Sequence, residues 1–166
     1  PHLPIHIVIN NAGGPQAGEV QSALEEQFLA GFKAHVLAAQ KIAKIVLPGM
    51  KAAKFGRFIN IISTSVKVPI PGLGVSNTIR GAMANWAKTL AYEVGLDGIT
   101  VNNVLPGFTK TERLDALLKN TSDKTGQTIQ TTAEQWKATI PARRFAESFE
   151  VAHAIAYLAS PAGSYI

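Results

Sequence analysis

The feature that most constrains the fold is an alternation of short apolar runs with long stretches of helical periodicity. The apolar runs are Ile5–Ile9, Arg57–Ile62 and Ile99–Leu105, each rich in β-branched residues and followed by polar, glycine or proline residues. Runs of this length and composition predict buried strands. Strands that alternate with helices along the chain predict an α/β fold with a parallel sheet.

Three segments between and after these runs have apolar residues at spacings of three and four, which predicts helices over about 25–54, 76–94 and 148–160. Pro48 and Gly49 predict a kinked or separate last turn in the first helix. Gly56 is expected to end that helix, and Gly95 to cap the second.

Composition narrows the class of protein. The 166 residues correspond to a single domain. Only 16% of residues are charged, which implies much buried surface or a surface given to partner subunits, and excludes intrinsic disorder. No cysteine is present, which fits a reducing compartment. No apolar run is long enough to span a membrane.

The net charge of +5 permits nucleic-acid binding without favouring it. The basic residues are scattered, and no aromatic residues interleave a basic stripe as single-strand binding requires. The sequence therefore favours small-molecule chemistry over nucleic-acid binding.

Parallel sheets bind ligands beyond the carboxyl ends of their strands. Three segments follow the predicted strands and should face such a site: Asn10–Pro15, Ser63–Gly74 and Pro106–Thr111. The long polar segment 108–142 comes after the third strand, and a segment of this length in that place predicts a functional lid.

Four motifs on these elements resemble the short-chain dehydrogenase/reductase family: Asn10–Gly13, Asn60–Ser63, Arg80–Ala82 and Val101–Gly107. Their order and placement on strands and helices carry the resemblance, which covers essentially the whole chain. It implies a Rossmann-like, doubly wound parallel sheet in three layers (α/β/α). It also implies a cytoplasmic, NAD- or NADP-dependent oxidoreductase acting on a carbonyl or alcohol, without a metal.

The family begins with a strand, a glycine-rich turn and a helix that hold the cofactor pyrophosphate through backbone N–H groups. No such turn occurs in this sequence. The chain therefore resembles the middle and C-terminal part of a family member, a single partial domain over 1–166 without the N-terminal half. The segment that selects between NAD and NADP lies in the missing part, so both cofactors stay open.

The family's catalytic residues can be carried over position by position. Ser63 matches the serine that holds the substrate oxygen, while Ser76 stands in place of the catalytic tyrosine and Arg80 in place of the lysine. His35 takes the position of the asparagine of the proton relay. A serine hydroxyl is a far weaker acid than a phenol, so the usual proton transfer is not expected, and His35 or water is the candidate acid.

Each of these positions also has a purely structural interpretation. Ser63 would cap a strand end, Ser76 would be a helix N-cap and Arg80 a surface residue. His35 would be a hydrogen-bonded core or interface histidine.

The resemblance also assigns residues to the cofactor. These are Asn10, Ala12, Gly13, Arg80, Pro106, Gly107, Thr109 and Thr111. The alternative is that the first three form a turn that needs no ligand, and that the two threonines are ordinary loop residues.

Two hypotheses follow. The first is a short-chain dehydrogenase/reductase-like enzyme with a small-molecule carbonyl or alcohol substrate, assembled as a homodimer or homotetramer through the two long helices. Trp86 would anchor that interface, or would instead fill the monomer core. The second is a catalytically impaired relative that binds nucleotide or a protein partner.

Overall fold

The computed structural model describes residues 4–166, in which three parallel strands form one sheet. The strands are β1 (Ile7–Asn10), β2 (Gly56–Ile61) and β3 (Ile99–Val104), arranged in the order β1-β2-β3. Residues 7–10 pair with 57–60, and residues 56–61 pair with 99–104. All three strands end at the same edge, as the expected parallel sheet requires.

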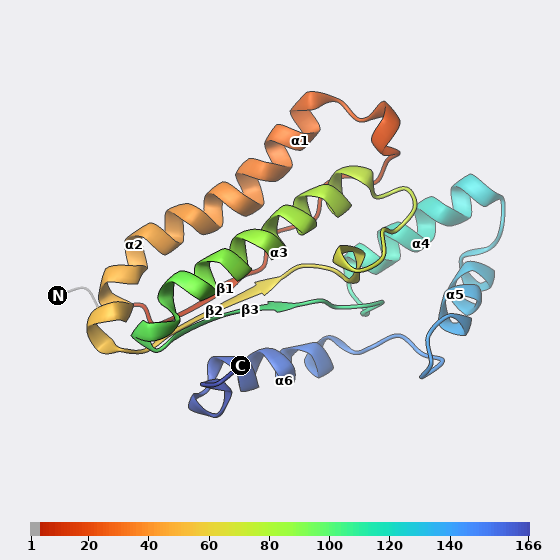
Figure 1. Ribbon diagram of the computed structural model, residues 1–166. Coiled ribbons are helices and arrows are strands. Elements are labelled where there is room, and N and C mark those ends of the chain that lie inside the picture. The colour runs from red at the N-terminus through yellow and green to blue at the C-terminus, as the bar shows by residue number, and fades with distance from the viewer. Residues whose placement is uncertain (1–3) are drawn as a thin grey trace. The chain divides into compact units, whose positions relative to one another are not determined.

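The chain divides into two compact units, the first running to Leu105 and resuming at Ile155, and the second comprising residues 106–154. In the first unit, α1 (Glu25–Phe32), a π-helical turn (Lys33–Leu37) and α2 (Ala38–Ala53) follow one another without a break. These elements and α3 (Gly74–Val94) cover one face of the sheet (Figure 1).

The core of the first unit lies between the sheet and these helices. Val8, Phe58 and Val101 are in register on neighbouring strands and face the helices. Their cluster includes Met50 from α2 and Leu90 from α3. Phe58 and Met50 are completely buried, so apolar burial between sheet and helices holds this unit together.

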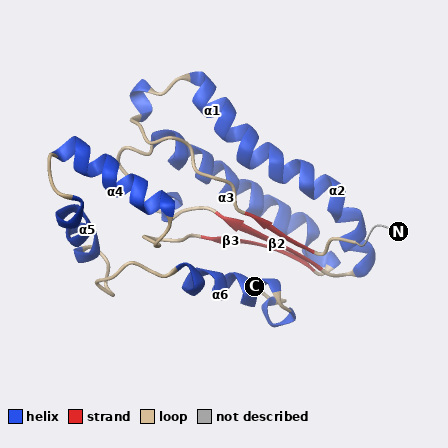
Figure 2. Cartoon of the chain, turned by 180° about the vertical axis from the view of Figure 1, so that it is seen from behind, coloured by secondary structure: helices blue, strands red, loops and turns tan. Residues whose placement is uncertain are grey.

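The other face of the sheet meets the returning end of the chain. Because side chains alternate along a strand, Asn102 points away from the helix-covered face. Its Nδ2 donates to the carbonyl of Ile166 (2.8 Å), which places the segment 155–166 on that second face. Figure 2 shows the strands from behind, with helices flanking them. The expected Rossmann-like α/β fold is confirmed.

Arg57 lies at the amino end of β2 and is only 2% exposed. Its guanidinium donates to the carbonyls of Gly56 (2.8 Å), Gly98 (3.3 Å) and Ser160 (3.5 Å). It also stacks over the ring of Phe55 at 4.3 Å. One side chain therefore ties the start of β3 and the C-terminal segment to the central strand.

One of the two expected helix ends is wrong, and the other is confirmed. α2 ends at Ala53, before Gly56, and its C-cap is Lys54 with φ 51°. Gly95 is the C-cap of α3, as expected, although its φ of −58° is not left-handed. A 3₁₀ turn, Gly95–Asp97, follows, and the left-handed Gly98 ends it. α2 runs on through Pro48 as one helix.

The loops after β1 and β2 are joined by a short parallel bridge. The Gly18 N–H donates to the Gly72 carbonyl (2.7 Å), and the Gly74 N–H donates to the Gly18 carbonyl (3.0 Å). A Cβ on Gly74 would lie 2.5 Å from the Cβ of Val20, so only glycine allows this approach. Short 3₁₀ turns, Val20–Ser22 and Thr64–Val66, lie in these loops.

The second unit contains α4 (Glu112–Thr125) and α5 (Ile129–Ala138), so the polar segment 108–142 is largely helical. Phe108 stacks on Trp136 with ring centroids 4.9 Å apart and joins a cluster with Leu114, Leu118 and Phe145. This unit therefore has a small apolar core of its own. A lid function for the segment stays a prediction.

The boundary between the units falls within α6 (Ser148–Ala159), which a 3₁₀ turn, Pro161–Gly163, follows. A single partial domain over 1–166 stays a prediction. Across residues 4–166, no helix combines the length and the apolar character needed to cross a membrane.

Candidate functional site

The carboxyl edge of the sheet carries a chain of asparagine side chains. Asn10 Nδ2 donates to Asn60 Oδ1 (2.8 Å), and Asn60 Nδ2 donates to Asn103 Oδ1 (3.1 Å). Asn103 in turn donates to the carbonyl of Ala84 in α3 (3.4 Å). The three asparagines are paired in the strand register, and Asn60 is fully buried. The Asn10 amide is therefore occupied in bracing the strand ends.

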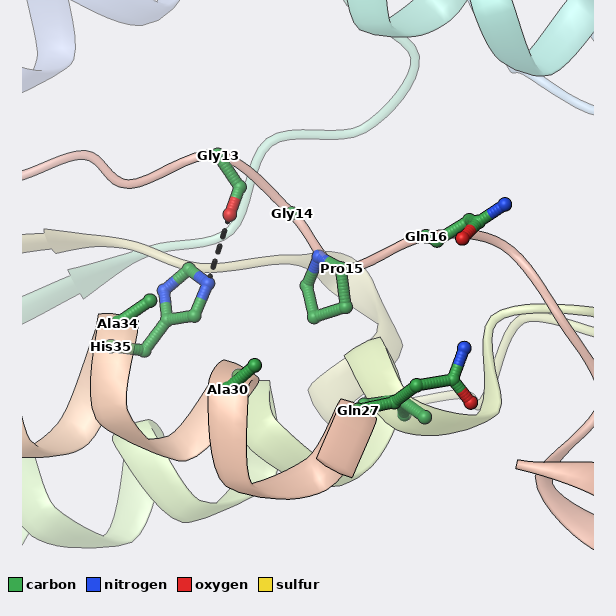
Figure 3. Close-up of a pocket in the computed structure, with 10 residues that line it drawn as sticks. Gly13, Gly14, Pro15, Gln16, Gln27, Ala30, Ala34 and His35 are labelled. Carbon is green, nitrogen blue, oxygen red and sulfur yellow. Dashed lines mark hydrogen bonds between the residues drawn. The ribbon is translucent and has the colours of Figure 1, made fainter. Parts of the chain in front are cut away.

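His35 lies in the π-helical turn, a distortion often found at functional sites. Its ring is 6% exposed, and Nε2 lies 3.0 Å from the carbonyl oxygen of Gly13 (Figure 3). Because a carbonyl only accepts, Nε2 carries the proton in this bond. Burial and the nearby Arg80 charge lower the pKa of His35, against a smaller raising effect of the Gly13 hydrogen bond. The ring is therefore neutral at neutral pH.

Arg80 lies on α3 and is buried, with 8% of its surface exposed. Its Nη1 donates to the carbonyl of Ile61 (2.7 Å) and its Nη2 to the carbonyl of Ala12 (3.4 Å). The interpretation of Arg80 as a surface residue is therefore wrong. The guanidinium joins the ends of β1 and β2 through their backbones.

Ser63 and Ser76 occupy different settings. Ser63 is the N-cap of the 3₁₀ turn after β2, where its Oγ accepts from the Ser65 N–H (3.1 Å). Ser76 lies inside α3, whose N-cap is Leu73, so the interpretation of Ser76 as an N-cap is wrong. Ser76 lies in the first turn of α3 and is buried, with 7% of its surface exposed.

The remaining predicted cofactor residues lie in the second unit. Thr111 is the N-cap of α4, with its Oγ1 accepting from the Leu114 N–H (3.4 Å). Thr109 Oγ1 donates to the Gly107 carbonyl (3.3 Å), and Thr109 forms a parallel bridge with Ala146. Pro106 and Gly107 precede them at the start of this unit. Thr111 thus has a helix-capping role, and ligand contact by these residues stays a prediction.

Three structural participants were missed at the sequence level. From the sequence, Asn60 and Asn103 are identified only as motif residues. Because each lies near the carboxyl end of its strand, a hydrogen bond between their side chains could have been expected. Gln27 of α1 accepts from the Leu24 N–H through Oε1 (2.9 Å), a capping contact that follows from its place three residues after Leu24.

A parallel sheet with flanking helices and polar side chains gathered at its carboxyl edge defines a Rossmann-like protein. Residues 2–166 match the family model described as Enoyl-(Acyl carrier protein) reductase. The chain belongs to the short-chain dehydrogenase/reductase family.

Curated relatives share about three residues in ten with this chain. It is 28% identical over 165 residues to a "putative ketoacyl reductase" of Streptomyces coelicolor, covering 98% of this chain and 63% of the relative. It is 30% identical over 162 residues to the 3-oxoacyl-[acyl-carrier-protein] reductase FabG of Vibrio cholerae, covering 98% and 62%. The chain thus spans less than two thirds of the length of either relative.

Solved structures agree with this fold. The NADPH-dependent reductase YwfH, involved in bacilysin biosynthesis, superposes with a TM-score of 0.91 at 29% identity, covering 98% of this chain and 63% of that one. The L-sorbose reductase of Gluconobacter frateurii, solved with NADPH and L-sorbose, has a TM-score of 0.88 at 28% identity, with coverages of 98% and 62%.

Proposed function

We propose that the protein containing this chain is an NAD- or NADP-dependent oxidoreductase that interconverts a small-molecule carbonyl and the corresponding alcohol. The observation that carries this proposal is Ser63, which lies immediately beyond the carboxyl end of the central strand. The likeness to the NADPH-dependent reductase YwfH and to the sorbose reductase solved with NADPH supports it.

The residues at the carboxyl edge fit one end of a dinucleotide. An added Cβ at Gly13 or at Gly107 would meet no atom within 4 Å, so the backbone there is open to a ligand. Asn10, Ala12, Gly13 and Arg80 would hold the nicotinamide riboside end from the first unit. Pro106, Gly107, Thr109 and Thr111 of the second unit are proposed as cofactor-binding residues on the family resemblance alone. Bound there, the nicotinamide supplies or accepts the hydride.

The roles of the chain's own side chains follow from their settings. The Ser63 hydroxyl would hydrogen-bond the substrate oxygen. His35 is neutral and protonated on Nε2, so it would accept a proton on Nδ1 more readily than it would donate one. This favours His35 as a base in alcohol oxidation, and leaves water as the acid in carbonyl reduction. Ser76 and Arg80 complete the proposed site.

One observation favours the second candidate function, a catalytically impaired relative that binds nucleotide or a protein partner. Arg80 donates to the carbonyls of Ile61 and Ala12, although the family position is held by a lysine that assists proton transfer. Ser76 adds no phenol. In this alternative the carboxyl edge binds a ligand without turning it over.

The experiment that separates the two uses the full-length protein. Binding of NADH and NADPH is measured by calorimetry, and oxidation of each is followed over a panel of aldehydes and ketones. Turnover that is lost in Ser63→Ala but retained in the matched Ser22→Ala variant supports the enzyme. Cofactor binding without turnover above background supports the impaired relative and rejects the enzyme.

We also propose that the protein is a cytoplasmic homodimer or homotetramer that pairs through its two long helices, the segment of α1, the π turn and α2, and α3. Trp86 of α3 is half-buried, packs on the core and donates Nε1–H to Gln40 Oε1 of α2 (2.8 Å). It therefore joins the two helices within one subunit and leaves part of its ring for a partner. Light scattering of wild type and Trp86→Ala tests this assembly, and a monomeric wild type rejects it.

A further inference from the structure

A pocket that includes His35 and Gly13, but neither Ser63 nor Ser76, lies between the loop after β1 and the helical segment formed by α1 and the π turn (Figure 3). Its volume is about 290 Å³, at the lower end of the range found for small-molecule sites. Gly13–Gln16 form one wall, residues of α1 and the π turn form the floor, and Val75 of α3 closes one side. The pocket lies entirely within the first unit.

The floor is one face of a helix, made of residues spaced by three and four. These residues are Gln27, Ala30, Gly31, Ala34 and His35. A Cβ on Gly31 would lie 2.9 Å from Ile79 Cγ1, so glycine is needed for packing there. Ala30 and Ala34 are exposed, and their side chains are small as well. Because these side chains are small, the pocket stays open along this face of the helix.

The polar groups of the pocket are uncharged. Gln27 Oε1 already accepts from the Leu24 N–H, which orients the amide and leaves its Nε2 as the donor. At the other end, burial and the nearby Arg80 charge lower the pKa of His35 and keep its ring neutral, while the bond to the Gly13 carbonyl orients it. No lining residue carries a charge that would compensate a buried ion.

We propose that this pocket binds a small, uncharged ligand with a short apolar body and an acceptor oxygen that receives a hydrogen bond from Gln27. Ala30, Gly31 and Ala34 would contact the apolar body. The pocket shares His35 and Gly13 with the proposed catalytic and cofactor site, but the ligand contacts proposed here, from Gln27, Ala30, Gly31 and Ala34, lie outside that site.

The test titrates the full-length protein, without cofactor, with 2-methylpropanamide and with 2-methylpropanoate, which have nearly the same shape. The amide is expected to bind with a saturable Kd. The carboxylate is expected to bind at least about tenfold more weakly, because no charged side chain lines the pocket to offset the water that its charge would lose. Binding of the carboxylate as tight as that of the amide, or no saturable binding of the amide, would overturn the proposal.

Two variants locate the site. Ala34→Leu places a larger side chain in the pocket and is expected to weaken amide binding at least about tenfold. The control Ala52→Leu, at an exposed position on α2 outside the pocket, should leave amide binding unchanged. Gln27→Glu keeps an oxygen for the Leu24 N–H but removes the donor, and should weaken binding about five- to tenfold. Unchanged amide binding in Gln27→Glu would overturn the proposal even if Ala34→Leu failed to fold.

Discussion

Two buried arginines stand at opposite edges of the same sheet and make different use of similar contacts. Arg57, at the amino edge, donates to three backbone carbonyls and stacks on Phe55. Arg80, at the carboxyl edge, donates to the carbonyls of Ile61 and Ala12 and lies near the ring of His35. Both use carbonyl oxygens, but only Arg80 stands among the predicted site residues.

The difference shows how one residue type serves packing at one edge and a candidate site at the other. Burial lowers the pKa of the Arg57 guanidinium, which nevertheless stays charged and is solvated by backbone dipoles. Arg80 is solvated in a similar way, but its charge also acts on a titratable neighbour, lowering the pKa of His35. Substitution of Arg57 should therefore change mainly the stability of the fold, whereas substitution of Arg80 should also change the chemistry of the candidate site.

The largest effect is expected from restoring the family residues at the carboxyl edge. The double variant Ser76→Tyr, Arg80→Lys adds a phenol beside an ammonium group, and general acid catalysis of this kind contributes about 100-fold or more. We expect kcat/KM for the best carbonyl substrate of the full-length protein to rise by about that factor. The matched control is Ser76→Phe, Arg80→Lys, which has the ring without the hydroxyl. Equal rates in the two double variants would show that the phenol does no chemistry there.

The next largest effect is expected at the amino edge. Arg57→Met should lower the free energy of unfolding by about 2–3 kcal/mol, because buried carbonyls lose their donor. Arg80→Met should cost about 1–2 kcal/mol, because the carbonyls of Ile61 and Ala12 lose a donor. Urea unfolding of both variants measures the difference. A larger loss in Arg80→Met than in Arg57→Met would reverse the assignment of roles.

A smaller effect concerns pH. The pKa of His35 in the folded protein lies below its unfolded value of about 6.5, so folding favours the neutral ring. The stability that this contributes is fully present above about pH 6.5 and is lost as pH falls through that value toward the folded pKa. His35→Asn should therefore flatten the stability profile between pH 7 and 5 in thermal melts. A variant as pH-sensitive as wild type in that window would exclude His35 as the source.

The smallest effect is expected at an exposed arginine, Arg144, which serves as a reference for the two buried arginines. Arg144 forms a two-pronged ion pair with Glu150 (both N–O distances 2.6 Å), and this contact lowers the pKa of Glu150 to about 2. The pair's contribution is present above the unfolded pKa of Glu150 and is lost as pH falls from about 4.5 to 2. Glu150→Gln should lower Tm by only about 1–2 °C at pH 7, because solvent screens the pair. A shift as large as that of Arg57→Met would contradict this ranking.

The fold could be predicted from the sequence because its elements follow hydrophobic periodicity, which depends only on nearby residues. The three strands and the helix over α1 and α2 lie within a few residues of their expected places. The helix ends were less predictable, because Lys54 adopts a left-handed conformation that glycine usually takes.

The site could be predicted only as a set of positions. That His35 and Gly13 lie close together was not foreseen, since they come from different elements 22 residues apart and no local pattern links them. The partners of Arg80 were equally out of reach, because a guanidinium chooses among carbonyls that only the folded chain brings together. Whether these residues act on a substrate depends on ligand contacts that no sequence pattern encodes.

The bridge at Gly18 also constrains how homologous chains can vary in length. Gly18 is fastened to Gly72 and Gly74 through both its N–H and its carbonyl, so residues 11–17 form a tether of set length between β1 and α3. An insertion there would have to bulge outward or break the bridge, whereas an added residue after Val20 would only lengthen a surface turn. Since Gly13–Gln16 lie within the tether, natural insertions and deletions should concentrate after the bridge and spare the pocket wall.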